Sequence, residues 1–133
     1  MRTYYLDANV LLRLATRTPE DLYARARDFI KQAEKRGDRL RVHPLHVATA
    51  VYVLKGYYEY ASEEIERVLG IVLRLKAIEV MEEALVFGGL RLMAEKGVDF
   101  DDAFLALLAQ KANASVLSFD QDFKKLGAPW HTP

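Results

Sequence analysis

Short β-rich runs alternate with helical patterns along the whole chain, and this alternation constrains the fold more than any other feature. Runs typical of buried strands lie at 3–6, 39–43, 77–80 and 115–119. Between them, apolar residues recur at helical spacing, as from Glu20 to Arg36, where Gly37 stands in the position of a C-terminal cap. Strands separated by helices favour right-handed crossovers and a mainly parallel sheet covered on both faces. The pattern predicts a three-layer α/β/α fold.

The boundaries of the helices follow from capping signals. Pro44 fits the first turn of a helix that runs to Tyr60, and Ser62 is a plausible N-cap for the next helix. The full set of helices is expected at 9–15, 20–36, 44–60, 62–75, 82–96, 99–111 and 122–126. Because 133 residues is close to the commonest domain size, we expect a single domain over 1–133. The last few residues, including His131, are expected to form a loose tail.

Composition narrows the class of protein. The chain has no Cys, which excludes disulfides and thiolate metal sites and fits a reducing cytoplasm. Asp7 interrupts the apolar N-terminal stretch, so we expect neither a signal peptide nor a membrane span, and a cytoplasmic protein. The 19 basic and 19 acidic residues balance, which disfavours a nucleic-acid binder driven by bulk charge. Any attraction to nucleic acid would be local or supplied by a bound cation.

Acidic residues stand at the ends of two predicted strands. Asp7 follows the first strand, and Asp120 follows the fourth, with Asp122 two residues on. Asp99 and Asp102 open the helix that leads into the fourth strand. In open parallel sheets the active crevice lies outside the carboxyl ends of the strands. Taken singly, each of these acids can equally be a helix cap.

Taken together, the acids predict a metal site. Two carboxylates about 4 Å apart repel by roughly 4 kcal/mol at an intermediate effective dielectric. A fold that gathers three or four of them needs a counter-cation or altered protonation. Oxygen ligands without Cys or a well-placed His favour Mg²⁺ or Mn²⁺ over zinc, and such an ion activates water for phosphoryl chemistry. We therefore expect Asp7, Asp102 and Asp120 to converge on a divalent metal ion.

Four stretches carry a family resemblance: YLDANVLLRL, VHPLHVATAVYVLKGYY, GVDFDDAFLALLAQ and ASVLSFDQDFKKLG. In order and spacing they resemble the PIN domain, and most of all its toxin branch, the VapC-type ribonucleases of toxin–antitoxin pairs. The resemblance covers about residues 3–127. It implies a PIN-like domain with a central four- or five-stranded parallel sheet and a Mg²⁺- or Mn²⁺-dependent endoribonuclease that hydrolyses RNA phosphodiester bonds. It also implies an antitoxin partner that blocks the site.

The same resemblance assigns roles to individual residues. Asp7 matches the first catalytic acid of the family, Asp102 the third and Asp120 the fourth. Other positions that line such sites, or stand at their edge, are matched by four more residues: Asn9, Ser118, Asp122 and Asp99. Of these, Asp122 is expected to assist through a metal-bound water.

The second acid of the family is absent from this chain. It is usually a Glu on the helix after the second strand, where this sequence has Thr49. A threonine hydroxyl can orient a metal-bound water, but it carries no charge. Glu59 stands about 15 Å further along the same helix and cannot replace it. Either metal affinity or turnover is reduced, or a neighbour such as Asp99 or Asp122 compensates for the missing acid. Two hypotheses for the function follow: a nuclease, or a catalytically weakened PIN domain that survives as an RNA- or protein-binding module.

Several other groups have both a structural and a functional interpretation. A basic segment is either a solvated helix face or an RNA-backbone contact, which would involve Arg25, Arg36, Arg39 and Arg41. Three tyrosines could stack on bases or pack against a partner: Tyr57, Tyr58 and Tyr60. His43 and His46 fit surface or capping roles better than ligand roles. The apolar helices at 44–60 and 62–75 suggest a homodimer or antitoxin surface.

Two rival parallel-sheet families share an acidic pocket. A haloacid-dehalogenase-like phosphatase requires Asp-x-Asp after its first strand, whereas this chain has Asp7-Ala8-Asn9. A phosphoacceptor receiver needs an acidic pair there and a lysine that closes the last strand, and the chain has neither. The first strand therefore argues against both families.

Overall fold

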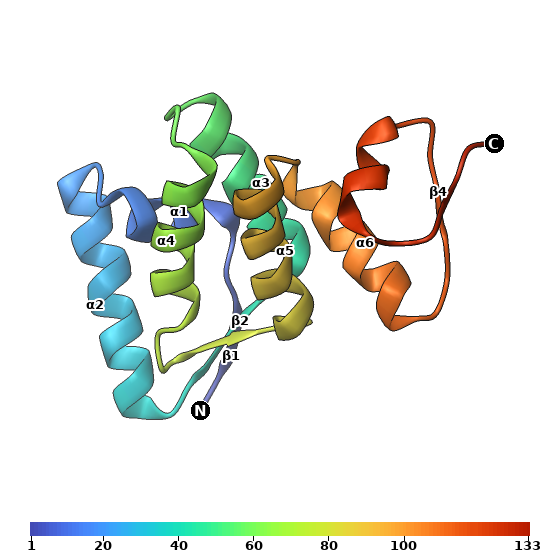
Figure 1. The fold of residues 1–133 in the computed structure, drawn as a ribbon. Helices are drawn as coiled ribbons and strands as arrows, with labels where there is room; N and C mark the ends of the chain where they lie inside the picture. The colour runs from blue at the N-terminus through green and yellow to red at the C-terminus, as the bar shows by residue number, and fades with distance from the viewer. The chain divides into compact units, whose positions relative to one another are not determined.

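The computed structural model describes residues 1–133 and divides into two compact units, Met1–Glu82 and Glu83–Pro133. The first unit contains β1 (Thr3–Tyr5), α1 (Ala8–Thr16), α2 (Glu20–Arg36), β2 (Arg39–Val42), α3 (Pro44–Gly56), α4 (Ser62–Leu73) and β3 (Ile78–Val80). The second contains α5 (Glu83–Lys96), α6 (Phe100–Lys111), β4 (Val116–Leu117), the 3₁₀ helix η1 (Gln121–Leu126) and β5 (Trp130–His131). Figure 1 traces this order along the chain. None of the helices has the length and hydropathy that a membrane span requires.

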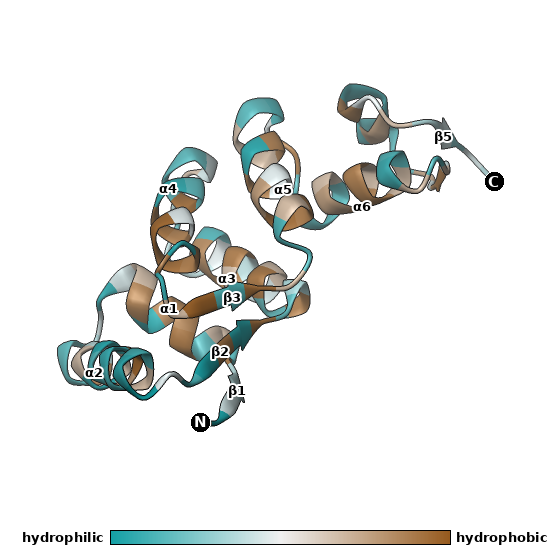
Figure 2. Cartoon of the chain, turned by 90° about the horizontal axis from the view of Figure 1, so that it is seen from below, coloured by the Kyte–Doolittle hydropathy of each residue, from teal (hydrophilic) through white to brown (hydrophobic).

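The first unit is built on a parallel sheet in the order β1-β2-β3. Leu40 and Val42 of the central strand are fully buried, whereas Arg39 and Arg41 alternate with them on the other face. Helix α1 contacts α2, α3 and α4, so the four helices share one apolar core. Figure 2 shows α2 mostly in the hydrophilic colour, in agreement with its having only Ile30 and Ala33 buried. Helix α2 therefore packs by a narrow apolar stripe, whereas α3 and α4 each bury five residues.

The second unit packs α5 against α6 and holds the parallel pair β4-β5. A Cβ atom added to Gly89 would approach Phe100 Cε1 to 3.0 Å, so only a glycine lets the first residue of α6 pack so closely on α5. The core of this unit consists of side chains from α6, β4, η1 and the residue just before the N-cap of α6: Val98, Ala103, Ala106, Ala109, Val116, Phe123 and Leu126. This packing fixes the start of α6, where Asp99 is the N-cap and Asp101 and Asp102 lie in the first turn.

The α/β class with parallel strands is confirmed. Every strand pairing is parallel, and the strands are hydrogen-bonded as a group of three in the first unit and a group of two in the second. The predicted helices are all present, most within two residues of the expected ends.

Three local predictions need correction. Helix α3 ends at Gly56 rather than Tyr60, because Glu59 adopts a left-handed φ of 59° and the Tyr60 N–H returns to the Leu54 carbonyl. The N-cap of α4 is Ala61, so Ser62 is already helical. The expected loose tail contains β5, whose Trp130 packs on the core of its unit and donates its indole N–H to the Ser118 carbonyl at 2.9 Å.

Candidate active site

In the first unit, Asp7 directly follows β1 and is the N-cap of α1. Its backbone is extended, with φ −75° and ψ 156°, and its Oδ1 accepts the Ala8 N–H at 2.7 Å. The capping role weighed from the sequence is therefore real, and it holds the carboxylate at the carboxyl end of the sheet. Asn9, in the first turn of α1, is exposed, as is Asp7.

In the second unit, three aspartates meet at the start of α6. Asp99 is the N-cap, and Asp101 and Asp102 lie in the first turn. One side-chain oxygen from each of the three lies within 4.8 Å of those of the other two. The Asp102 N–H also donates to Asp101 Oδ1 at 3.0 Å. The sequence singled out Asp99 and Asp102 but missed Asp101, although the run Asp99-Phe100-Asp101-Asp102 places it one residue away.

The end of β4 brings a second set of polar groups. Ser118 Oγ accepts the Asp120 N–H at 2.9 Å, and Asp120 Oδ1 accepts the Asp122 N–H at 2.8 Å, which caps η1. Asp122 also forms an ion pair with Lys125 at 3.7 Å. This chain of short contacts sets the orientation of Asp120 as the strand ends.

The two sets of acids act on each other through Asp102. Burial is the largest cause that raises the pKa of the Asp102 carboxyl, and the negative charges of four neighbouring carboxylates add to it, so that together they bring this pKa to about 6. In order of importance, these neighbours are Asp101, Asp120, Asp99 and Asp122. Every charge that shifts this pKa is negative. The second unit therefore gathers five carboxylates around a point that a cation would stabilise.

The position of the missing second acid is also in the first unit. Thr49 is exposed on α3, and its hydroxyl donates to the Leu45 carbonyl at 3.1 Å, one turn back along the helix. This bond leaves the oxygen lone pairs as acceptors or ligands but supplies no charge. The predicted convergence of Asp7 with Asp102 and Asp120 joins residues of two different units and stays a prediction.

Most of the arginines predicted to contact RNA have protein partners. Arg36 Nε donates to Asp38 at 2.8 Å, and Arg39 binds Glu79 through two hydrogen bonds of 3.0 and 3.2 Å. Arg41 donates to the hydroxyl of Tyr5 at 3.1 Å and lies 3.4 Å from Glu79. Arg25 is exposed on α2.

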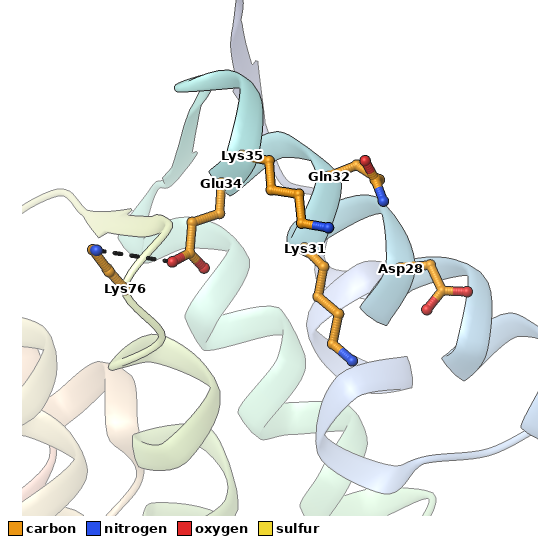
Figure 3. Close-up of a pocket in the computed structure, with 6 residues that line it drawn as sticks. All are labelled: Asp28, Lys31, Gln32, Glu34, Lys35 and Lys76. Carbon is orange, nitrogen blue, oxygen red and sulfur yellow. Dashed lines mark ion pairs between the residues drawn. The ribbon is translucent and has the colours of Figure 1, made fainter.

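Two hollows lie on the first unit. One, of about 550 Å³, is lined by charged and polar side chains of α2 and by Lys76, which pairs with Glu34 (Figure 3). Lys76 comes just before β3, so this hollow belongs to the amino ends of the strands, away from Asp7. The other, of about 290 Å³, is largely apolar and includes Asp7 in its wall, with Tyr4, Val10 and Phe29.

The chain is similar to a known protein family and to solved structures. The family model of the PIN domain matches residues 4–129. A similar solved structure is that of VapBC2 from Rickettsia felis bound to a DNA fragment from their promoter, with 18% identity, 99% of this chain and 98% of that chain covered, and a TM-score of 0.39. Another is PAE2754 from Pyrobaculum aerophilum, with 25% identity, 98% and 92% covered, and a TM-score of 0.34. No curated protein matches the chain.

Proposed function

The chain belongs to the PIN domain family, and we propose that it is a VapC-like toxin: a metal-dependent endoribonuclease that hydrolyses RNA phosphodiester bonds and is neutralised by a cognate antitoxin. The observation that carries the proposal is the cluster at the start of α6, where one side-chain oxygen each of Asp99, Asp101 and Asp102 lies within 4.8 Å of the other two. The carboxylates of Asp120 and Asp122 lie close enough to help raise the pKa of Asp102. Of the five carboxylates, Asp122 has an ion pair with Lys125, but the charges that shift the pKa of Asp102 are all negative. Such a concentration of negative charge around Asp102 favours the binding of a cation.

The donor set fits a hard divalent ion. Asp102, Asp120 and Asp122 offer carboxylate oxygens, and we assign Asp7 to the same ion as the acid from the first unit. Oxygen-only ligands with space for water suit Mg²⁺ or Mn²⁺. When bound, such an ion supplies activation of a water molecule and neutralisation of charge on phosphate oxygens.

The residues of the chain hold this arrangement in place. Packing of Phe100 against Gly89 anchors the first turn of α6, and the Ser118 hydroxyl anchors the backbone of Asp120. Burial of Asp102 excludes part of its water, which strengthens its attraction for a cation. Asn9 and Asp99 stand beside the acids of their own units and serve as further polar contacts.

The decisive test is substitution of Asp7. Asp7→Asn keeps an oxygen that can cap α1, so the fold should be retained, but it removes one negative ligand. We expect cleavage of labelled RNA in the presence of Mn²⁺ to be lost with this variant and restored by no amount of added metal. The matched control is Asp28→Asn, which changes an exposed aspartate of α2 whose ion-pair partner is its neighbour Arg27. An Asp7→Asn protein that cleaves RNA as fast as the wild type would refute the proposal.

A second candidate function rests on Thr49. The hydroxyl at the position of the missing acid carries no charge, which favours a PIN domain that binds RNA or protein with little turnover. Incubation of the purified protein with RNA and Mn²⁺, with and without chelator, separates the two. Cleavage that the chelator stops supports the nuclease, whereas RNA binding without cleavage supports the binding module.

The remaining parts of the proposal concern partners and location. Exposed apolar side chains on α3 and α4, or within two residues of their ends, support a homodimer or antitoxin surface: Leu45, Tyr52, Tyr57, Ile71 and Leu75. A cytoplasmic location follows from the assignment as a toxin. Light scattering of the purified protein measures the oligomeric state, and co-expression with the product of a short neighbouring reading frame tests for the antitoxin.

A further inference from the structure

His43 and Asp7 occupy equivalent places on neighbouring strands. The register pairs Tyr5 with Arg41, and the Leu6 N–H continues the pairing by donating to the Arg41 carbonyl at 2.9 Å. Two residues beyond the paired Tyr5 and Arg41 stand Asp7 and His43, which are both in extended conformation. Neighbouring strands lie about 4.8 Å apart, and alternate residues of an extended chain point to the same side. The two side chains therefore share one edge and one side of the sheet.

The hydrogen bond at Nδ1 of His43 determines whether the other ring nitrogen, Nε2, can donate a hydrogen bond. Its Nδ1 accepts the Leu45 N–H at 3.0 Å and so caps α3. A neutral imidazole that accepts at Nδ1 carries its proton on Nε2. The side chain is exposed, so this Nε2–H is available to a ligand. The cap also fixes the ring, which makes His43 an oriented donor rather than a mobile one.

The other basic side chains of the same strand are engaged elsewhere. Arg39 holds Glu79 with two hydrogen bonds, and Arg41 is shared between Tyr5 and Glu79. Both arginines lie within β2, whereas His43 directly follows its last residue, at the same edge of the sheet as Asp7. Of these three basic side chains, His43 is therefore the one whose place along the strand direction matches that of Asp7.

We propose that His43 is a substrate-binding residue whose Nε2–H donates a hydrogen bond to a non-bridging phosphate oxygen of single-stranded RNA held at the Asp7 edge. This inference rests on the proposed nuclease function and adds to it a residue of the backbone-binding surface. A hydrogen bond to a charged phosphate contributes enough to change affinity about tenfold. Contacts of this kind position the RNA without reading its sequence.

Two variants separate this role from capping. In His43→Asn the side-chain oxygen can replace Nδ1 as the cap acceptor, and Asn is among the best N-cap residues, but the reach of Nε2–H is lost. His43→Asp also caps and adds a negative charge. We expect the Kd for a fluorescein-labelled oligouridylate, measured by anisotropy in EDTA, to rise about tenfold for His43→Asn and further for His43→Asp. Melting temperatures should stay close to that of the wild type.

The control removes a full positive charge from the opposite edge of the sheet. Lys76→Ala breaks the pair with Glu34 beside the hollow of Figure 3, and we expect it to leave the Kd unchanged within twofold. Equal binding by wild type, His43→Asn and His43→Asp would overturn the role of His43 while RNA cleavage by the wild type still supported the nuclease. If the wild type neither binds nor cleaves RNA, the nuclease proposal fails and the role of His43 fails with it.

Discussion

Asp38, which is buried, and Asp102, which is partly buried, lie one in each unit, and their pKa values move in opposite directions. Asp38 accepts the Arg2 N–H at 2.8 Å and the Arg36 Nε–H at 2.8 Å. These two hydrogen bonds, the one from Arg2 first, lower the pKa of Asp38 below its usual 3.8. Burial and the neighbouring carboxylates raise the pKa of Asp102 to about 6. The fold thus gives Asp38 hydrogen-bond donors that stabilise its charge, whereas it leaves Asp102 among like charges.

The difference distinguishes an acid with a structural role, Asp38, from the acid that we propose as a metal ligand, Asp102. Asp38 ties the start of β1 to the turn before β2, so its charge is balanced within the fold. The charged groups that shift the pKa of Asp102 are all negative, so the charge of its carboxylate is one that a bound cation would stabilise. Perturbed acids of the second kind are typical of active sites, because the fold itself gains nothing from them.

The largest expected effect is on RNA cleavage, and it tests the distinction between Asp102 and Asp38 directly. Asp102→Asn should reduce metal-dependent RNA cleavage by roughly 10³-fold, because a metal ion contributes several kcal/mol to such reactions. Asp38→Asn removes the same charge from the other unit and should leave the cleavage rate of the folded protein nearly unchanged. Initial rates at saturating Mn²⁺ make the comparison. Similar losses in both variants would mean that Asp102 acts through the fold rather than through the site.

A smaller change in cleavage rate is expected on substitution of Thr49. This residue of the first unit is uncharged at the position of a family carboxylate, whereas the second unit has several carboxylates close together. Thr49→Glu should raise cleavage about tenfold by adding a carboxylate at the position of the second family acid. Thr49→Gln has the same length without the charge and is the matched control. A rise with Glu alone supports a weakened metal site, whereas no rise with either variant means that the chain has compensated for the missing acid.

The sequence predicted the elements better than the relations between them. Periodicity and caps located α2 to the residue and placed Asp7, Asp99 and Asp120 at helix starts, because these signals are local. It missed Asp101, since acids in the first turn of a helix are explained by the helix dipole alone. It also missed β5, because a two-residue strand has no periodicity and depends on Trp130 packing against a distant core. The pKa of Asp102 is likewise a product of tertiary packing, which no spacing reveals.

At the level of stability, Asp38→Asn should lower the melting temperature by about 5 °C at pH 7, because the Arg36 guanidinium loses its charged partner. The folded-state pKa of Asp38 is lowered, so its contribution is present above the unfolded pKa of 3.8 and is lost as the pH falls through the lower folded value. The difference in melting temperature between the variant and the wild type should therefore narrow only in strong acid. Thermal unfolding followed by circular dichroism at pH 7, 4 and 2.5 measures it, and a constant gap would assign the effect to packing instead.

The smallest effect has the opposite sign and is expected at Asp102 in metal-free protein. Its folded-state pKa of about 6 lies above the unfolded value of 3.8, so the folded state holds the proton more tightly. Ionisation of Asp102 therefore destabilises the folded protein. This destabilisation is absent below the unfolded pKa, and it grows as the pH rises toward the folded-state pKa. Asp102→Asn carries no such charge and should melt a few degrees higher than the wild type at pH 7 in EDTA.

The same variant should show no advantage at pH 3.5, where Asp102 is protonated in the folded protein. Added Mn²⁺ should make the wild type melt at the higher temperature of the two at pH 7, because only the wild type retains the full set of carboxylates to bind the ion. Stabilisation of Asp102→Asn without metal, together with its loss of cleavage, would identify Asp102 as an acid kept at a cost to the fold. A variant that is less stable than the wild type at pH 7 in EDTA would place Asp102 with Asp38, among the acids that hold the structure together.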